Sequence, residues 1–116
     1  HRLALKGAKV LVLGVAYKRD IDDYRESPAI TILDLLERKG AITAYYDPYV
    51  PSFREDGHVR TGIASLDGLG DYDAVVIVTD HKVVDYADVV ARAKVVVDTR
   101  NATKGVTQGR EKIRML

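Results

Sequence analysis

Charged side chains lie close together in the segment that directly follows the first apolar run of the chain. That run, Lys9–Val15, reads KVLVLGV, and the segment after it extends to Ser27. In open α/β sheets, ligands bind at the carboxyl ends of central strands, where the chain leaves the sheet. The segment is therefore the first candidate for a binding site. Its charged side chains are Lys18, Arg19, Asp20, Asp22, Asp23, Arg25 and Glu26.

Two later apolar runs, DAVVIVT and KVVV, also end in polar residues. If all three runs are parallel strands, their polar ends converge on one edge of the sheet. At that edge the guanidinium group of Arg100 could hold a phosphate or a sugar carboxylate in bidentate fashion, and a surface pair with Asp98 is the alternative. Thr79 is expected to line the same pocket, together with Asp80.

The elements that must position these residues follow from periodicity and from capping residues. Nearly continuous apolar runs bounded by turn residues predict parallel strands that are covered on both faces. Ser27 is a natural N-cap, Pro28 suits the first helical position and Gly40 stands at the C′ position, so a helix is expected between them. Apolar residues at helical spacing predict a second helix over residues 83–92. The predicted strands are Lys9–Val15, Ala41–Tyr46, Asp73–Thr79 and Lys94–Val97.

Strands that alternate with helices predict the α/β class, with right-handed crossovers. We expect a Rossmann-like open parallel sheet with helices on both faces and a strand order of about 3-2-1-4-5. In this order the run Lys9–Val15 lies mid-sheet, and His58–Ile63 forms a short edge strand. Residues 48–58 are expected to be irregular, and the residues after Ala102 are expected to form a turn, a tail or a short terminal helix.

Composition limits the classes of function that the chain can have. With 116 residues and a formal charge of +1, we expect one domain over residues 9–116 and no nucleic-acid partner. Residues 1–8 are expected to be the tail of an upstream segment or a tag remnant. No run reaches the roughly 18 apolar residues of a membrane span, so no membrane partner is expected. The chain has no cysteine, which removes thiolate metal ligands and a cysteine nucleophile.

The first turn of a dinucleotide-binding Rossmann domain would carry the glycine pattern GxGxxG, which this chain lacks. The residues after Gly14 are Val15, Ala16, Tyr17 and Lys18. The second glycine of the pattern lets the backbone approach a pyrophosphate, and side chains at these positions would hinder that approach. Independent binding of NAD in the usual mode is therefore not expected.

The same residues carry a resemblance to a known family. The stretch GVAYKRDIDDYRESP, followed by a helix and YYDP, resembles the C-terminal domain of the UDP-glucose/GDP-mannose dehydrogenase family, the NAD-dependent nucleotide-sugar 6-dehydrogenases. VIVTDH and VVVDTRN are also similar to later strand ends of the family, so the likeness covers roughly residues 7–102. The matching residues are Gly14, Ala16, Tyr17, Lys18, Asp23, Arg25, Glu26, Ser27, Tyr46, Asp47 and Pro48.

The resemblance implies a cytoplasmic parent enzyme of three parts. Its N-terminal domain would bind most of the NAD, a central helical segment would make a homodimer, and this domain would close over a UDP- or GDP-sugar. Such an enzyme oxidises a sugar CH2OH to a carboxylate in two hydride transfers, through a thiohemiacetal on a cysteine of another domain. The present chain, as a fragment of it, is expected to bind substrate without turning it over.

The resemblance also suggests roles for two residues of the charged segment. The lysine that matches Lys18 reaches the nucleotide sugar, which suits a compact charge able to meet several oxygens, whereas a solvated Lys18 is the alternative. The arginine that matches Arg25 faces the NAD, and its alternative is a brace for Asp22 or Asp23. The predicted substrate-binding residues are thus Lys18, Thr79 and Arg100, with Arg25 as a cofactor contact and no catalytic or metal-binding residue.

Three other side-chain types have structural explanations. Asp47 follows the second strand, where a Rossmann domain places its ribose-binding acid, but capping of its own turn explains it better without the glycine pattern. His81 has no ligand-spaced partner for a metal. The tyrosines are expected to pack half-buried with their hydroxyl groups in water. They are Tyr45, Tyr46, Tyr49, Tyr72 and Tyr86.

Two other classes of function compete with a nucleotide-sugar site. A phosphorelay receiver shares the fold class, but it needs paired acids directly after the first strand and a lysine after the fifth, where this chain has Arg100. A purely structural or protein-binding α/β module is the third class. Saturable binding of UDP would separate the first class from both.

Overall fold

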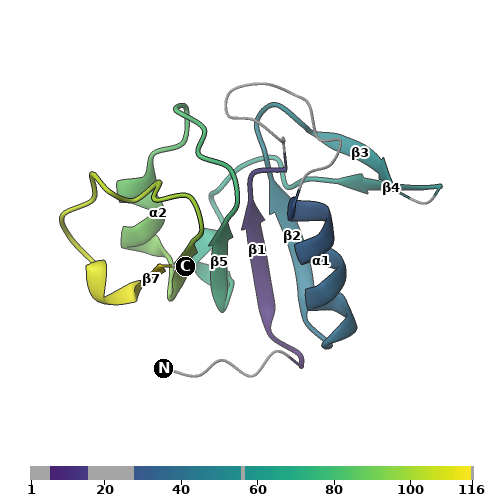
Figure 1. Cartoon of the computed structure of the whole chain (residues 1–116), viewed down its shortest axis with the longest axis horizontal. Helices are drawn as coiled ribbons and strands as arrows, with labels where there is room; N and C mark the ends of the chain where they lie inside the picture. Colours follow the sequence, from purple (N-terminus) through teal and green to yellow (C-terminus); the bar gives the residue numbers. More distant parts are fainter. Residues whose placement is uncertain (1–5, 16–27, 56, 116) are drawn as a thin grey trace.

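A five-stranded parallel sheet forms the centre of the protein in the computed structural model, which describes residues 6–15, 28–55 and 57–115 (Figure 1). The strand order is β2-β1-β5-β6-β7, and every neighbouring pair is parallel. This architecture confirms the predicted Rossmann-like α/β class. The strands are β1 (Lys9–Leu13), β2 (Ile42–Tyr46), β5 (Ala74–Ile77), β6 (Val96–Asp98) and β7 (Ile113–Met115).

Strand β1 lies inside the sheet, as its apolar sequence predicts, and its alternate side chains face two separate helices. Val12 packs with Leu33 of helix α1 (Pro28–Arg38), whereas Leu11 packs with Val89 of helix α2 (Tyr86–Arg92). All four side chains are at most 1% exposed. One helix therefore covers each face of the sheet, and the strand needs apolar residues at successive positions.

Pro28 and Gly40 mark the bounds of α1 as the sequence predicts, whereas Ser27, the predicted N-cap, lies outside the described residues. The helix begins at Pro28 as expected, and the chain leaves it through Gly40, whose φ of 91° is left-handed and whose N–H donates to the Glu37 carbonyl. Helix α2 begins at Tyr86 rather than at residue 83. The reason is Asp85, whose carboxylate accepts the Asp88 N–H as an N-cap.

A hairpin replaces the expected irregular segment and the expected edge strand. Strands β3 (Ser52–Glu55) and β4 (His58–Thr61) pair antiparallel with each other, so the prediction that His58–Ile63 joins the main sheet is wrong. A hairpin satisfies both strands locally, and Phe53 anchors it by packing against the Tyr45 ring at 5.3 Å. The fifth strand of the main sheet comes instead from the C-terminal part of the chain.

The fifth strand of the main sheet is β7, which lies in the segment for which a turn, tail or short terminal helix was expected. It pairs with β6 through registers such as Val96 with Ile113. A short 3-10 turn, η2 (Arg110–Lys112), precedes β7, and another, η1 (Leu69–Asp71), precedes β5. Lys112 ties the turn η2 to α2 by donating to the carbonyls of Val90 and Ala91, both at 3.0 Å. Among the helices that the structure describes, none is both long and apolar enough to cross a membrane.

Candidate functional site

The carboxyl ends of β1, β2, β5 and β6 lie at one edge of the sheet, because these strands are parallel neighbours. The chain leaves them at Val15, Asp47, Thr79 and Thr99, respectively. Polar residues from distant parts of the sequence therefore meet at this edge, as the sequence predicts for Thr79, Asp80 and Arg100. Lys18 and Arg25 lie outside the described residues.

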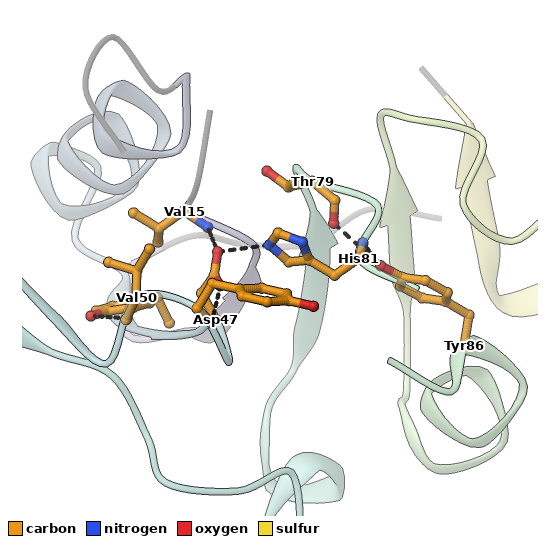
Figure 2. Close-up of polar contacts among 8 residues, drawn as sticks. Val15, Asp47, Val50, Thr79, His81 and Tyr86 are labelled. Atoms are coloured by element: carbon orange, nitrogen blue, oxygen red, sulfur yellow. Dashed lines mark hydrogen bonds and ion pairs between the residues drawn. The ribbon is translucent and has the colours of Figure 1, made fainter. Parts of the chain in front are cut away.

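Asp47 joins the ends of three strands through one carboxylate (Figure 2). Its Oδ2 accepts the Val15 N–H at 2.7 Å and lies 3.0 Å from Nε2 of His81, while its Oδ1 accepts the Tyr49 N–H at 2.8 Å. The Tyr49 bond is the turn cap that the sequence predicts. The side chains of Asp47 and His81 are 0% and 1% exposed, so this is a fully desolvated pair.

His81 links this carboxylate to helix α2. Its backbone N–H donates to the Tyr86 hydroxyl at 2.9 Å, and that hydroxyl donates to the Thr79 carbonyl at 3.2 Å. The Tyr49 ring packs on the imidazole with centroids 4.9 Å apart. His81 thus has a positional role at the end of β5, and within the described ranges no group of three or more histidine or acidic residues could hold a metal ion.

The buried hydroxyl groups of Tyr45 and Tyr86 correct the expectation that the tyrosine hydroxyls contact water. The Tyr45 hydroxyl donates to the Val50 carbonyl at 2.8 Å, and burial raises the pKa of Tyr45 to about 12. Burial also raises the pKa of Tyr86. Both groups consequently remain neutral donors at physiological pH and help to fix the loops at this edge.

Gly14 explains why the chain turns so tightly after β1. Its φ is 92°, and a Cβ atom at this position would lie 2.6 Å from Cβ of Thr79 and 2.7 Å from the Thr79 backbone nitrogen. Such distances exclude a side chain, so Gly14 serves close approach of two strand ends. Thr79 itself is 3% exposed, which leaves only a small part of it open to a ligand.

Asp98 organises the loop that carries Arg100. Its Oδ1 accepts the Arg100 and Ala102 amides at 3.0 and 3.1 Å, and its Oδ2 accepts the amide and hydroxyl of Thr103 at 2.9 and 2.6 Å. Burial would raise the pKa of Asp98, but the bonds from Thr103 and from the Arg100 and Ala102 amides outweigh it and hold the pKa below its ordinary value. Asn101 adopts a left-handed φ of 58° within this loop.

The contact between Arg100 and Asp98 therefore runs through the Arg100 backbone amide, and Asp98 is buried rather than part of a surface pair. Arg100 is exposed at the rim of the edge. Three amides of this loop donate to one carboxylate, which orders the loop and holds the backbone of the exposed Arg100 in place. This arrangement suits an anionic ligand at the carboxyl edge.

Comparison with known proteins identifies the family. Residues 11–105, which run from within β1 through α1, β2, β5, α2 and β6 to the loop after it, match the description "UDP-glucose/GDP-mannose dehydrogenase family, UDP binding domain". The chain belongs to this family. The prediction that rests on GVAYK, RESP, YYDP and VVVDTRN is thereby confirmed.

Relatives within the UDP-glucose/GDP-mannose dehydrogenase family are longer proteins. The chain is 30% identical over 107 residues to a UDP-N-acetyl-D-mannosamine dehydrogenase from Methanococcus vannielii, covering 85% of this chain and 24% of the relative. It is also 30% identical over 109 residues to a UDP-glucose 6-dehydrogenase from Rickettsia bellii, covering 86% of this chain and 25% of that relative. The chain thus spans about a quarter of the length of the curated relatives it matches.

Solved structures of the same family share the fold. A UDP-D-ManNAc dehydrogenase from Pyrococcus horikoshii superimposes with a TM-score of 0.76 at 30% identity, over 97% of this chain and 26% of that one. A UDP-glucose dehydrogenase from Pyrobaculum islandicum gives a TM-score of 0.65 at 29% identity, over 97% and 25% of the two chains. These superpositions cover nearly the whole chain, beyond the stretches that sequence motifs mark.

Sequence reasoning missed two features of this site: the Asp47–His81 pair and the hydrogen bonds around Asp98. Asp47 and His81 are 34 residues apart, and neither lies in a local metal or catalytic pattern. One usable signal was their common place at strand ends, because Asp47 directly follows one predicted strand and His81 lies two residues after another. For Asp98, the signal was an acid at a strand end followed by Thr103 five residues later.

Proposed function

We propose that this chain is the substrate-binding domain of an NAD-dependent nucleotide-sugar 6-dehydrogenase, which oxidises a sugar CH2OH to a carboxylate. The observation that carries the proposal is the family match over residues 11–105, which covers the whole carboxyl edge of the central strands. The names of the relatives, which include UDP-N-acetyl-D-mannosamine and UDP-glucose dehydrogenases, favour a UDP-sugar over a GDP-sugar.

The binding role rests on three residues that follow different strands. Arg100 is exposed on the loop built around Asp98, Thr79 lies at the end of β5, and Lys18 follows the end of β1 by only a few residues. Two cations approaching from separate loops can neutralise a diphosphate, and the guanidinium group can hold two oxygens at once. The formal charge of the whole chain is only +1, so attraction of the anion depends on these local groups.

The remaining functions of the parent belong to chain segments beyond this one. The proposal places most of the NAD on an N-terminal domain, with Arg25 of this chain facing it, and places dimer formation on a central segment. With no cysteine among its 116 residues, the chain cannot itself form the thiohemiacetal. It therefore binds the nucleotide sugar as one wall of a cytoplasmic enzyme whose chemistry is completed by other domains.

Titration of the full chain with UDP, measured by calorimetry, tests this function. We expect weak saturable binding, and we expect Lys18→Ala and Arg100→Ala each to reduce the affinity about tenfold or more, since a hydrogen bond to a charged group contributes roughly 1.5–3 kcal/mol. Lys39→Ala is the matched control. It removes an exposed lysine after α1, at the opposite edge of the sheet, and should leave the affinity unchanged.

Two further measurements define the outcome. Titration with GDP under the same conditions decides which base is preferred, and mixing the chain with NAD and a UDP-sugar should produce no NADH absorbance. Absence of UDP and GDP binding would overturn the proposal in favour of a protein-binding α/β module. Formation of NADH would show that the chain contains chemistry that the proposal assigns to other domains.

A further inference from the structure

The Asp47–His81 pair contacts Val15, the residue directly before the segment that carries Lys18. No step of the proposed function uses this pair. Its two side chains are buried, come from the ends of β2 and β5, and hold the Val15 amide at the end of β1 (Figure 2). Burial of two ionisable groups away from water is costly unless both are well hydrogen-bonded, so the fold has a physical reason to hold this geometry closely.

We infer that Asp47 and His81 are positioning residues, which set where the chain leaves β1 at Val15, directly before the segment that carries Lys18. The link to UDP binding rests on the proposed function, whereas the effect on the end of β1 does not. Val15 is the last described residue before the charged segment, and its N–H is held at 2.7 Å by the carboxylate. Because Lys18 lies three residues further along the chain, we expect a shift of Val15 to weaken the UDP binding that the proposed function assigns to Lys18.

His81 fixes the carboxylate in turn. Its Nε2 holds the same oxygen, Oδ2, that accepts the Val15 N–H, so the imidazole decides where that oxygen lies. The imidazole is itself held from two sides, by the Tyr49 ring at 4.9 Å and, through the backbone N–H of His81, by the Tyr86 hydroxyl of α2. A continuous series of contacts therefore connects helix α2 to the end of β1.

Close packing makes this connection stiff. Gly14 approaches Thr79 so tightly that no Cβ atom fits between them, and the Gly14 N–H donates to the Tyr46 carbonyl at 2.9 Å. The ends of β1, β2 and β5 consequently cannot move independently by much. The Asp47 carboxylate is the group that all three strand ends share, so a change in its position should alter the end of β1.

The decisive variants alter the donor that His81 offers to Asp47. His81→Leu removes it at similar volume, whereas His81→Gln keeps an N–H donor of comparable reach. In a ¹⁵N-labelled full chain, we expect His81→Leu to shift the amide resonances of Val15 and of residues 16–20, and to weaken UDP binding about tenfold. His81→Gln should restore most of both properties, which a purely space-filling role for His81 would not predict.

Tyr45→Phe is the matched control, because it also deletes one buried hydrogen bond on the same side of the sheet, to the Val50 carbonyl. It should lower stability without shifting the Val15 resonance or the UDP affinity. If His81→Leu does not fold, Asp47→Asn provides the test. Its single carbonyl oxygen cannot serve Val15, His81 and Tyr49 together, so the same resonances should shift.

Wild-type resonances for Val15 and residues 16–20 in His81→Leu, or equal shifts in Tyr45→Phe, would overturn the inference. If His81→Leu binds UDP with unchanged affinity while Lys18→Ala binds it more weakly, the inference is overturned and the proposed function stands. If the unaltered chain binds no UDP, the proposed function fails, and the resonance comparison still decides whether the pair positions the end of β1.

Discussion

At the scale of single residues, Asp98 shows how a buried acid can be more acidic than a free one. Desolvation alone would raise its pKa, but a hydroxyl and three backbone amides stabilise the charged form more strongly. Because the folded pKa lies below the unfolded one, the contribution of Asp98 to stability is present above the unfolded pKa and is lost as pH falls through the folded pKa.

The variant Thr103→Val tests this account, since valine fills the space of threonine without its hydroxyl. We expect the free energy of unfolding at pH 7 to fall by about 1.5–3 kcal/mol, the contribution of a hydrogen bond to a charged group. The difference from the unaltered chain should narrow as pH drops below 3.8, the ordinary value, and Asp98 takes up a proton. Urea unfolding over a pH series measures both quantities.

Thr107→Val is the control, because Thr107 is exposed and should tolerate the same change. A difference for Thr103→Val that stays constant down to acid unfolding would show that the hydroxyl does not act through the charge of Asp98.

At the scale of elements, the β3–β4 hairpin has an apolar contact with β2, made by Phe53, and ion pairs with α1, made by Arg60. Phe53 is 3% exposed and packs on Tyr45. Arg60 lies 2.8 Å from Glu37 and 3.3 Å from Asp34, but these carboxylates are 39% and 40% exposed, so water and salt screen the pair. The hydrogen bond from Arg60 holds the pKa of Glu37 below its ordinary value despite partial burial.

We therefore expect the apolar contact to dominate. Phe53→Ala should lower the free energy of unfolding by about 3–5 kcal/mol, because it leaves a cavity next to Tyr45. Arg60→Ala should lower it by less than about 1 kcal/mol, and the loss should shrink further in high salt. Urea unfolding at low and high sodium chloride gives the comparison, and equal losses in the two variants would reverse the ranking.

The elements also show which parts of the fold can be predicted from sequence. Strand β1 and helix α1 were predictable because their signals are local: a continuous apolar run, a proline at the first helical position and a glycine after the last turn. The hairpin had a local signal too, since Asp56-Gly57 is a typical turn dipeptide between short polar strands. Among the side chains of these strands whose burial is described, however, Phe53 alone is buried. Strand β7 has only one buried side chain, at Ile113, and thus shows no periodicity.

The candidate site likewise contains residues that could be predicted from the sequence and residues that could not. Arg100, Thr79 and Asp80 were predictable as strand-end residues, because topology alone brings such residues to one edge. The Asp47–His81 pair was not, since its formation depends on the register between β1, β2 and β5, which no local pattern specifies. Assignments for Lys18 and Arg25 stay predictions, because they depend on the resemblance and fall outside the described residues.

At the scale of the whole molecule, residues close to the C-terminal end of the chain complete the sheet as β7. Ile113 is 9% exposed and belongs to the same core cluster as Val96 and Val106, whereas Met115, on the same strand, is 47% exposed. The edge of the sheet thus depends on a single side chain of β7 for its apolar contact with the rest of the protein.

Ile113→Ala should accordingly lower the free energy of unfolding by about 2 kcal/mol, the lower end for such truncations because the strand lies at an edge. Met115→Ala is the matched control and should change it by less than about 0.5 kcal/mol. Thermal unfolding followed by circular dichroism compares the two. Equal, small effects would mean that β7 adds little to the stability of the sheet.

The central place of β1 also has a consequence for synthesis on the ribosome. Val10 pairs with Thr43 on one side and with Ala74 on the other, so β1 leaves the ribosome well before its second neighbour, β5, has been made. During that interval one edge of β1, an almost wholly apolar strand, stays unpaired. Unpaired apolar strand edges are bound by chaperones and are prone to aggregate. Slowing translation before residue 74 should therefore lower the soluble yield, and slowing it after residue 98 should have much less effect.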